Sequence, residues 1–452
     1  IAHLACAMLY PFIKALVRIT TSVFFKRIVV SGERNLPAAG PLIIVANHPN
    51  TLMDPLLVAS LAEQRIGFVA NAGLFTNRLL RPFLRYFHAI PIYRKKDVAP
   101  GEKRDNAEAF SKCHEYLATG GTFLIFPEGS SLYELNLREI KTGTARIALS
   151  YEASKGFAGG LRILPVALDY SDAIQFRSMV AITVEPPLEV AAYKATFLRD
   201  EEEAVDLLTA DIRRALAKNV PWTTGKEQED LLIKAHAFYT AYAAPDADLH
   251  ADPRRSLELR KQLAEALHHI RGTRPDLYGE TAAKLLSFFN TLDTDHLTPG
   301  FYAEPFLRKN KALVCAGYLL EFVLLLPVYL FGLITNYVPY ILPSLVFNAL
   351  RAELEYKAPV QMVVGLITFP VFYALDLWVF GHWIGTWGLV ALSVLLPLSG
   401  YLAMFYWTEM QRFARVIRFL FLVKDERKKA MLRERDLILT HMLDARRSLS
   451  GS

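Results

Sequence analysis

The chain has 452 residues, of which 52% are hydrophobic, and a formal net charge of +6. This length is enough for two or three domains, and the positive mean hydropathy is high for a soluble protein. The excess is concentrated between residues 312 and 407, a mostly apolar stretch that is typical of a membrane anchor. The charge is too small and too diffuse to indicate a nucleic-acid-binding protein, but it suits contact with anionic membrane lipids.

The first 26 residues are apolar residues interrupted by Lys14, Arg18 and Lys26. The first uncharged run is too short to span a bilayer comfortably. We therefore expect residues 1–26 to form an amphipathic helix at the membrane interface, with its cations at headgroup level. A buried packing helix is the alternative.

Between residues 27 and 219, short apolar runs alternate with helix-like stretches. Residues 105–118 carry a helical apolar stripe that ends at Gly120-Gly121, and residues 200–218 resemble a closing helix. The runs rich in Ile, Val and Phe that predict strands are PLIIVANH, RIGFVANA, AIPIYR, TFLIFPEG, LRILPVALDY and MVAITVEPP. This alternation predicts an α/β domain, a layered sheet with flanking helices.

Residues 220–310 are charged, with a helical pattern and no strand pattern, and we interpret them as a helical connector. Transmembrane helices are expected within residues 311–408, and residues 409–452 are expected to form a charged helix.

The apolar region contains four candidate segments. Residues 312–334, 360–380 and 386–407 are long enough to span a membrane, whereas residues 337–350 are short and contain two prolines. Basic clusters flank the region on both sides, which favours both ends on the cytoplasmic face and thus an even number of passes. Residues 337–350 would then be a short or re-entrant pass; three spans are the alternative. Glu321 and Asp376 should face protein or water.

The stretch VANHPNTLMDP places His48 six residues before Asp54, directly after an apolar run. At a strand-to-helix junction, a neutral histidine can accept the proton of a hydroxyl, and a nearby carboxylate can fix its tautomer. The alternative is that Asn-His-Pro-Asn is only a turn.

Three downstream segments add anion-binding chemistry. Arg94 closes the AIPIYR run as a fixed cation suited to phosphate. Glu128, Gly129 and Ser130 open a loop after FLIFP whose backbone amides and hydroxyls can hold oxyanions. Lys141 precedes a helix start near residues 142–144. Together with a base–acid pair, these features predict a site that acylates a phosphate-bearing alcohol.

Four segments, in this order along the chain, resemble the motifs of the glycerol-phosphate/lysophosphatidate acyltransferase family: NHPNTLMDP, AGLF with HAIPIYR, FPEGSS, and ILPVAL. The resemblance covers residues 35–190 and implies the layered α/β fold of that family. It implies His48 as general base, Asp54 as its charge partner, and an acyl thioester of coenzyme A or acyl carrier protein as donor. The implied substrate contacts are Asn47, Arg94, Glu128, Gly129, Ser130 and Lys141, with Pro165 shaping the acyl-donor side.

The chain departs from the family pattern in three places. Five residues separate His48 from Asp54 instead of four, so the pair can meet only if the loop bulges before the helix starts. This spacing is similar to a branch that acts on glycerol 3-phosphate or dihydroxyacetone phosphate. The loop EGSS lacks the usual Thr-Arg, whose charge Arg138 or Lys141 would have to supply, and His88 precedes Ala89 where a glycine is usual.

We therefore expect an integral membrane acyltransferase of phospholipid synthesis, with its catalytic domain on the cytoplasmic face. Glycerol 3-phosphate or dihydroxyacetone phosphate is the favoured acceptor, and 1-acylglycerol 3-phosphate is the alternative. The expected partners are the acyl donor, the acceptor and membrane lipids, with no cofactor, no metal and no nucleic acid. Cys6, Cys113 and Cys315 lack metal-ligand or redox spacing. A non-catalytic lipid-binding protein on the same fold is a different possibility, and a transporter is a third.

Overall fold

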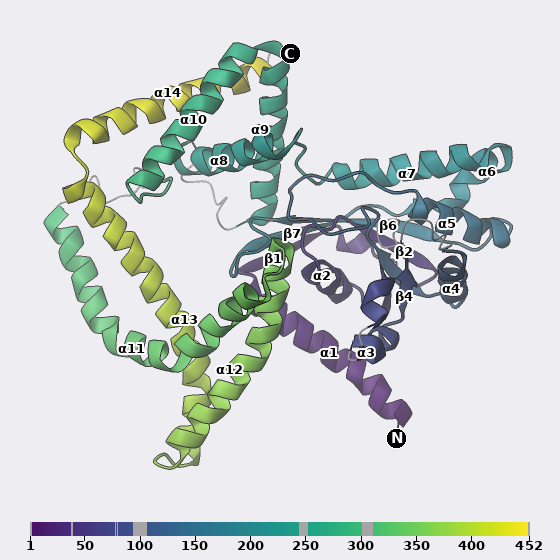
Figure 1. Cartoon of the computed structure of the whole chain (residues 1–452), viewed down its shortest axis with the longest axis horizontal. Coiled ribbons are helices and arrows are strands. Elements are labelled where there is room, and N and C mark those ends of the chain that lie inside the picture. The colour runs from purple at the N-terminus through teal and green to yellow at the C-terminus, as the bar shows by residue number, and fades with distance from the viewer. Residues whose placement is uncertain are drawn as a thin grey trace. The chain divides into compact units, whose positions relative to one another are not determined.

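The computed structural model describes residues 2–37, 39–76, 78, 80–93, 106–243, 252–300 and 311–450 (Figure 1). The chain divides into two compact units. One holds residues 1–222 with the later segments 251–257 and 354–359, and the other holds residues 223–250, 258–353 and 360–452.

The first unit is built on a mixed sheet in the order β1-β7-β6-β2-β5-β3-β4, with β8 paired to β6. The pairs β1/β7, β2/β5, β2/β6, β3/β4 and β3/β5 are parallel, and β6 is antiparallel to β7 and β8. The strands are β1 (Arg27–Ser31), β2 (Leu42–Ala46), β3 (Ile66–Asn71), β4 (Ala89–Ile92), β5 (Thr122–Ile125), β6 (Arg162–Tyr170), β7 (Met179–Val184) and β8 (Leu188–Glu189). The layered mixed sheet confirms the predicted fold class.

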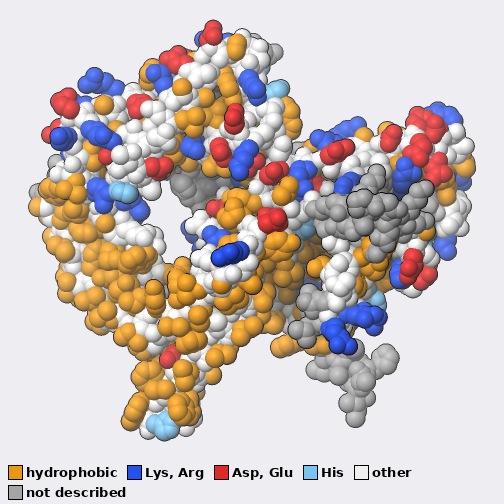
Figure 2. Space-filling model, viewed as in Figure 1, with side chains coloured by type: hydrophobic (Ala, Val, Ile, Leu, Met, Phe, Trp, Pro, Cys, Tyr) orange, Lys and Arg blue, Asp and Glu red, His pale blue; other side chains and the backbone are white. Residues whose placement is uncertain are grey.

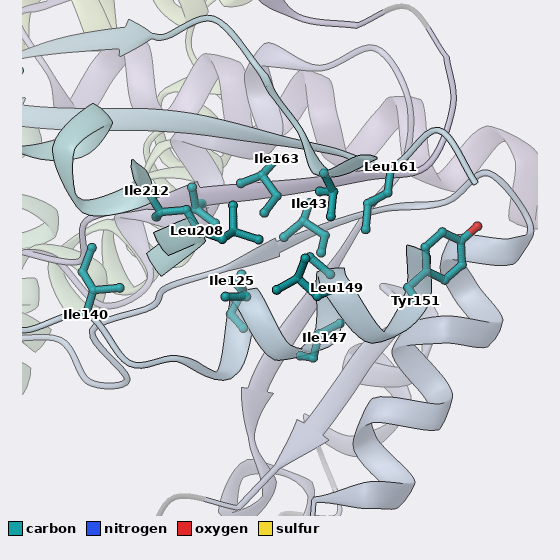
Figure 3. Packing of buried hydrophobic residues seen from close by; sticks show 14 of the residues in the cluster. Ile43, Ile125, Ile140, Ile147, Leu149, Tyr151, Leu161, Ile163, Leu208 and Ile212 are labelled. Atoms are coloured by element: carbon teal, nitrogen blue, oxygen red, sulfur yellow. The ribbon is translucent and has the colours of Figure 1, made fainter. Parts of the chain in front are cut away.

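Helices cover the sheet because its central strands are apolar on both faces. Every residue of β2 is buried, and only alternate ones, Ile43 and Val45, belong to the main core. Figure 3 shows Ile43 with residues such as Leu149 and Leu208 from the helices. The helices of this unit are α1 (Ala2–Phe24), α2 (Met53–Leu61), α3 (Leu80–Tyr86), α4 (Ala107–Ala118), α5 (Gly143–Ser154), α6 (Lys194–Arg199) and α7 (Glu201–Ala217).

The predicted strands β2 to β7 and the helices α4 and α7 are confirmed, whereas β1 and β8 were not predicted. The helix predicted to start near residues 142–144 is α5.

Helix α1 packs on the carboxyl end of α2. The ammonium of Lys14 donates to the carbonyl of Ala62, and Arg18 Nη2 donates to the carbonyl of Ser60 at 2.9 Å. The last carbonyls of a helix lack intrahelical partners and attract cations. These two cations therefore bind the carboxyl end of α2, and their predicted place at headgroup level stays a prediction. Phe12 and Ile19 on α1 are exposed, and the interfacial placement of α1 stays a prediction.

The described part of the second unit is helical. The helices are α8 (Lys226–Tyr242), α9 (Pro253–Thr273), α10 (Pro275–Thr294), α11 (Lys311–Leu350), α12 (Lys357–Gly381), α13 (Thr386–Ile417) and α14 (Asp425–Ser450), with a π-helical turn at Arg418–Leu422. Side chains from α8, α10 and α14 form one buried core, which includes Phe238, Phe288 and Ile438.

Within the described residues, three helical segments are long and apolar enough to cross a membrane: Cys315–Leu350, Leu354–Gly381 and Thr386–Leu422. Their exposed side chains are largely hydrophobic (Figure 2). Residues 337–350, predicted to be a short or re-entrant pass, continue the same helix as residues 312–334 and are not a separate segment. Pro327, Pro339 and Pro343 lie inside this helix and do not end it.

Candidate active site

The VANHPNTLMDP stretch forms the end of β2, a loop and the start of α2. β2 ends at Ala46 and α2 begins at Met53, so His48 lies in the loop and Asp54 in the first helical turn. The backbone N–H of Asp54 donates to the carbonyl of Asn50 at 3.1 Å, which closes the loop. Nδ1 of His48 lies 2.8 Å from Oδ2 of Asp54. The extra residue is accommodated before the helix, as the pairing required.

Asp54 is fully buried and receives three polar contacts. Besides His48, the backbone N–H of Asn50 donates to Oδ2 at 2.7 Å, and the hydroxyl of Tyr170 donates to Oδ1 at 2.5 Å. Burial raises the pKa of the Asp54 carboxyl, while the contacts from His48, Tyr170 and Asn50 oppose that rise. Burial and Asp54 raise the pKa of Tyr170 well above its usual value, so Tyr170 stays a donor.

The ring of His48 has a second contact besides its hydrogen bond to Asp54. It stacks on Phe126 with 3.8 Å between ring centroids and an interplanar angle of 7°. The side chain of His48 is 15% exposed. With Nδ1 directed at Asp54, Nε2 has no hydrogen-bond partner among the residues described here, so it is the ring nitrogen left for a substrate hydroxyl.

Glu128 fixes the backbone of His48. Its Oε1 accepts a hydrogen bond from the His48 N–H at 2.8 Å, and its Oε2 accepts one from Arg138 Nε at 2.9 Å. Arg138 Nη1 also donates to Ser130 Oγ at 2.9 Å, and Nη2 donates to the Ser130 carbonyl. Arg138 therefore supplies a cation to the EGSS loop from a different place in the sequence, and its donors are directed at Glu128 and Ser130.

Gly129 and Lys141 lie against each other. Gly129 has a φ of +75°, and a Cβ atom there would lie 2.6 Å from the Lys141 ammonium. A side chain at this position would therefore be strained and would displace Lys141. Lys141 itself is exposed, and its predicted contact with the substrate stays a prediction.

Two other predicted contact residues lie directly after β2 and within β6. The amide of Asn47 donates to the Leu168 carbonyl at 2.8 Å and accepts from the Leu168 N–H at 2.7 Å. Pro165 is buried in β6 beside Val45, and its carbonyl accepts from the Glu185 N–H at 2.9 Å. Both residues make internal contacts, and their predicted contacts with substrates stay predictions. Arg94 lies outside the described residues.

Sequence reasoning missed Asn50, Phe126 and Tyr170. Phe126 directly follows β5, and Tyr170 ends β6. Both strands run parallel to β2 as its neighbours, so their carboxyl ends meet at the edge where His48 lies. The signal was the polar or aromatic residue at the end of each apolar run, but the order of the strands was needed to use it.

No group of three or more His, Cys, Asp and Glu side chains suited to a metal occurs among the described residues. Two clefts of about 470 and 450 Å³ lie in the helical unit, and neither is lined by a predicted site residue.

The family model described as Acyltransferase matches residues 10–169. "Glycerol-3-phosphate O-acyltransferase 2" of Saccharomyces cerevisiae is 32% identical over 116 residues, which are 25% of this chain and 16% of that protein. The chloroplastic 1-acyl-sn-glycerol-3-phosphate acyltransferase LPAT1 of Arabidopsis thaliana is 23% identical over 145 residues, 32% of this chain and 36% of that protein.

Among solved structures, the 1-acyl-sn-glycerophosphate acyltransferase PlsC of Thermotoga maritima has 21% sequence identity and a TM-score of 0.35, and the match covers 47% of this chain and 82% of that chain. The matches span only 16% to 52% of the lengths of the curated relatives. Residues 10–169 thus match the acyltransferase family model, and relatives similar to this chain are named as glycerol-phosphate acyltransferases.

Proposed function

We propose that this chain transfers a fatty acyl group from an acyl thioester to the hydroxyl of a glycerol-phosphate-type acceptor at a membrane. The observation that carries the proposal is the contact of His48 Nδ1 with the buried carboxylate of Asp54, which leaves Nε2 of this partly exposed side chain for a substrate. A histidine held in this way can accept a proton from an alcohol.

The reaction needs no covalent acyl-enzyme. His48 Nε2 takes the proton of the acceptor hydroxyl while its oxygen attacks the thioester carbonyl carbon. Asp54 stabilises the imidazolium that forms. The tetrahedral intermediate then collapses, the carbon–sulfur bond breaks, and the thiolate leaves with the proton returned from His48. An ester and a free thiol result, and the enzyme regains its starting protonation state.

We assign phosphate recognition to two cations. Lys141 is the exposed cation beside Gly129 and Ser130, and Arg94 keeps its predicted role as a second phosphate ligand. Glu128 and Arg138 are bonded to each other and to neighbouring groups, so they support the site by holding the His48 backbone and the loop.

The favoured acceptor is glycerol 3-phosphate or dihydroxyacetone phosphate. The five-residue separation of His48 and Asp54 supports this choice, as does the similarity to the yeast protein named a glycerol-3-phosphate O-acyltransferase. The alternative acceptor is 1-acylglycerol 3-phosphate, for which the plant relatives are named. The donor is an acyl thioester of coenzyme A or acyl carrier protein, with no other cofactor. The three apolar helices support an integral membrane protein, and we place its catalytic domain on the cytoplasmic face.

The test is an acyl-transfer assay on membranes containing the chain. Glycerol 3-phosphate, dihydroxyacetone phosphate and 1-acylglycerol 3-phosphate are offered in parallel, each with palmitoyl-coenzyme A and palmitoyl-acyl carrier protein. We expect activity on one acceptor, and a loss of at least about 10³-fold in His48→Ala. His382→Ala, a change of an exposed histidine between α12 and α13, is the matched control and should retain full activity. Equal turnover by His48→Ala would refute the assignment of the base. No transfer to any acceptor would favour the non-catalytic lipid-binding alternative.

Lys141→Met provides a second measurement. Removing the exposed ammonium should raise the KM for the phosphate acceptor several-fold and leave kcat nearly unchanged, because the lost contact is equally present in the ground state and the transition state. Arg138→Met is the comparison variant. It should lower thermal stability, since it leaves the buried Glu128 carboxylate unpaired. An unchanged acceptor KM in Lys141→Met would remove Lys141 from the phosphate site.

A further inference from the structure

The helices on either side of the apolar region pack together. α10 precedes the three apolar helices and α14 follows them, yet Leu285 and Phe288 share a buried core with Met431 and Ile438. Arg427 Nε also donates to Asp295 Oδ2 at 2.8 Å. Polar helix ends in direct contact must lie on one side of a membrane. The chain therefore crosses an even number of times between these helices, although three helices are long and apolar enough to cross.

The first half of α11 runs antiparallel to α13. Tyr318 stacks with Phe413 at 4.9 Å between ring centroids, and Tyr329 stacks with Tyr406 at 4.2 Å. Further along, a Cβ atom on Gly332 would lie 2.3 Å from the Ser399 carbonyl oxygen, so the two backbones touch. As residue numbers rise in α11, they fall in α13.

The second half of α11 runs antiparallel to α12. The Tyr373 hydroxyl donates to Asn336 Oδ1 at 2.7 Å, Thr368 Oγ1 donates to the Pro339 carbonyl at 3.1 Å, and Gln361 Nε2 donates to Ser344 Oγ at 3.1 Å. These three pairs have falling numbers in α12 as numbers rise in α11. Because α12 and α13 are joined by a short turn and converge on Asn336, α11 must reverse its direction near that residue.

The turn of α11 has a physical cause. Pro339 and Pro343 lack N–H groups, which bends the helix and frees the carbonyls four residues earlier. One of these is the Pro339 carbonyl, and Thr368 of α12 satisfies it. Asn336 bonds Gly332, Leu396 and Ser399 as well as Tyr373. Figure 1 shows α11 as a strongly curved helix.

The end of α11 is also anchored. Thr51 Oγ1, in the loop between His48 and Asp54, donates to the carbonyl of Glu355 at 3.0 Å. Glu355 is buried and belongs to the compact unit of the α/β domain. No candidate span occurs among the described residues before α11. Tyr318 near the start of α11 contacts Phe413 of α13, and Ser344 near its end contacts Gln361 at the start of α12. The start and the end of α11 thus lie at the same end of the α12–α13 pair.

We propose that α11 is a re-entrant helix that enters the membrane and returns to the face it came from, while only α12 and α13 cross. The helix from Gln361 to Gly381 is about 30 Å long, which matches the hydrocarbon core. The part from Gln361 to Tyr373 is about 18 Å long, so the turn at Asn336 lies just beyond the bilayer midplane. Outward side chains of α11, such as Val323, Leu324 and Ile334, are 67%, 67% and 76% exposed. Lipid acyl chains cover them.

Cysteine labelling in sealed membrane vesicles tests this topology, whether or not the chain transfers acyl groups. In a background in which Cys6, Cys113 and Cys315 are replaced by serine or alanine, single substitutions Glu265→Cys, Glu353→Cys, His382→Cys and Glu426→Cys are treated with a membrane-impermeant maleimide before and after permeabilisation. We expect positions 265, 353 and 426 to react on one side and position 382 on the other. Tyr340→Cys, near the turn, should react from neither side.

Three crossings would instead place 265 and 382 on one side and 353 and 426 on the other. Reaction of Tyr340→Cys from the side of position 382 would mean that α11 passes fully through and back. Either result overturns the proposal. A protease test with the unsubstituted chain covers variants that fail to fold. An epitope fused after residue 452 should be digested on the same side of the vesicle as the α/β domain, and digestion on opposite sides would contradict the even number of crossings.

Discussion

Two clusters of polar side chains in this molecule differ in charge, and we relate this difference to their roles in catalysis and in helix packing. The His48 cluster consists of His48, Asn50, Asp54 and Tyr170, and it contains a fully buried carboxylate. The Asn336 cluster consists of Thr335, Asn336, Tyr373 and Ser399, lies between apolar helices, and contains only neutral groups.

In the Asn336 cluster each side chain bonds another helix or its own backbone, so the bonds end within the protein. In the His48 cluster the bonds lead outward, from Tyr170 to Asp54 to His48 Nδ1, and end at a ring that remains partly exposed. A buried charge is costly unless it is paired. We infer that the His48 cluster contains a buried carboxylate because the reaction needs one, and that the Asn336 cluster holds helices together.

Asp54→Asn should give the largest effect among changes to the partners of His48. An asparagine amide can present a donor to His48 Nδ1 and so favour the tautomer with its proton on Nε2, which cannot accept the proton of the hydroxyl. We expect kcat to fall by roughly 10³-fold while the acceptor KM changes little. The measurement is steady-state kinetics with the best acceptor, next to a thermal unfolding scan. A variant that is folded and still fully active would show that the two clusters do not differ in kind.

Tyr170→Phe should give an intermediate effect. It removes the hydroxyl from Asp54 Oδ1 and leaves the ring, so Asp54 and His48 keep their other contacts. Because Tyr170 acts by positioning Asp54, kcat should fall roughly tenfold with the acceptor KM unchanged. Tyr193→Phe is the matched control, since the Tyr193 hydroxyl bonds Asp211 Oδ2 at 2.7 Å outside the site. It should lose similar stability without loss of kcat. Equal kcat values for the two variants would mean that Tyr170 is only structural.

The sequence predicted those features that depend on neighbouring residues. The strands β2 to β7 were found because their apolar runs are flanked by turn residues, and His48 and Asp54 because they stand in one motif. β1 was missed because RIVVS is short and follows an apolar helix directly. Tyr170 could not be assigned to Asp54, because its role depends on the pairing of β6 with β2 across more than a hundred residues.

The extent of α11 was not predicted, for a related reason. A proline inside a helix usually ends it in water, so Pro339 and Pro343 suggested a separate segment at residues 337–350. In the folded chain the carbonyl freed by Pro343 is satisfied by Thr368 from another helix, so the helix bends and continues. No local pattern reveals such a partner.

Tyr373→Phe should give the smallest effect and tests the other side of the comparison. It removes the hydroxyl that donates to Asn336 Oδ1 but leaves Asn336 its bonds to α13. Hydrogen bonds between membrane helices contribute about 0.6 kcal/mol on average. We therefore expect a small decrease in thermal stability in detergent and no change in kcat. A loss of kcat as large as that of Tyr170→Phe would mean that the Asn336 cluster also serves the reaction, because a cluster that only holds helices together should change stability and not rate.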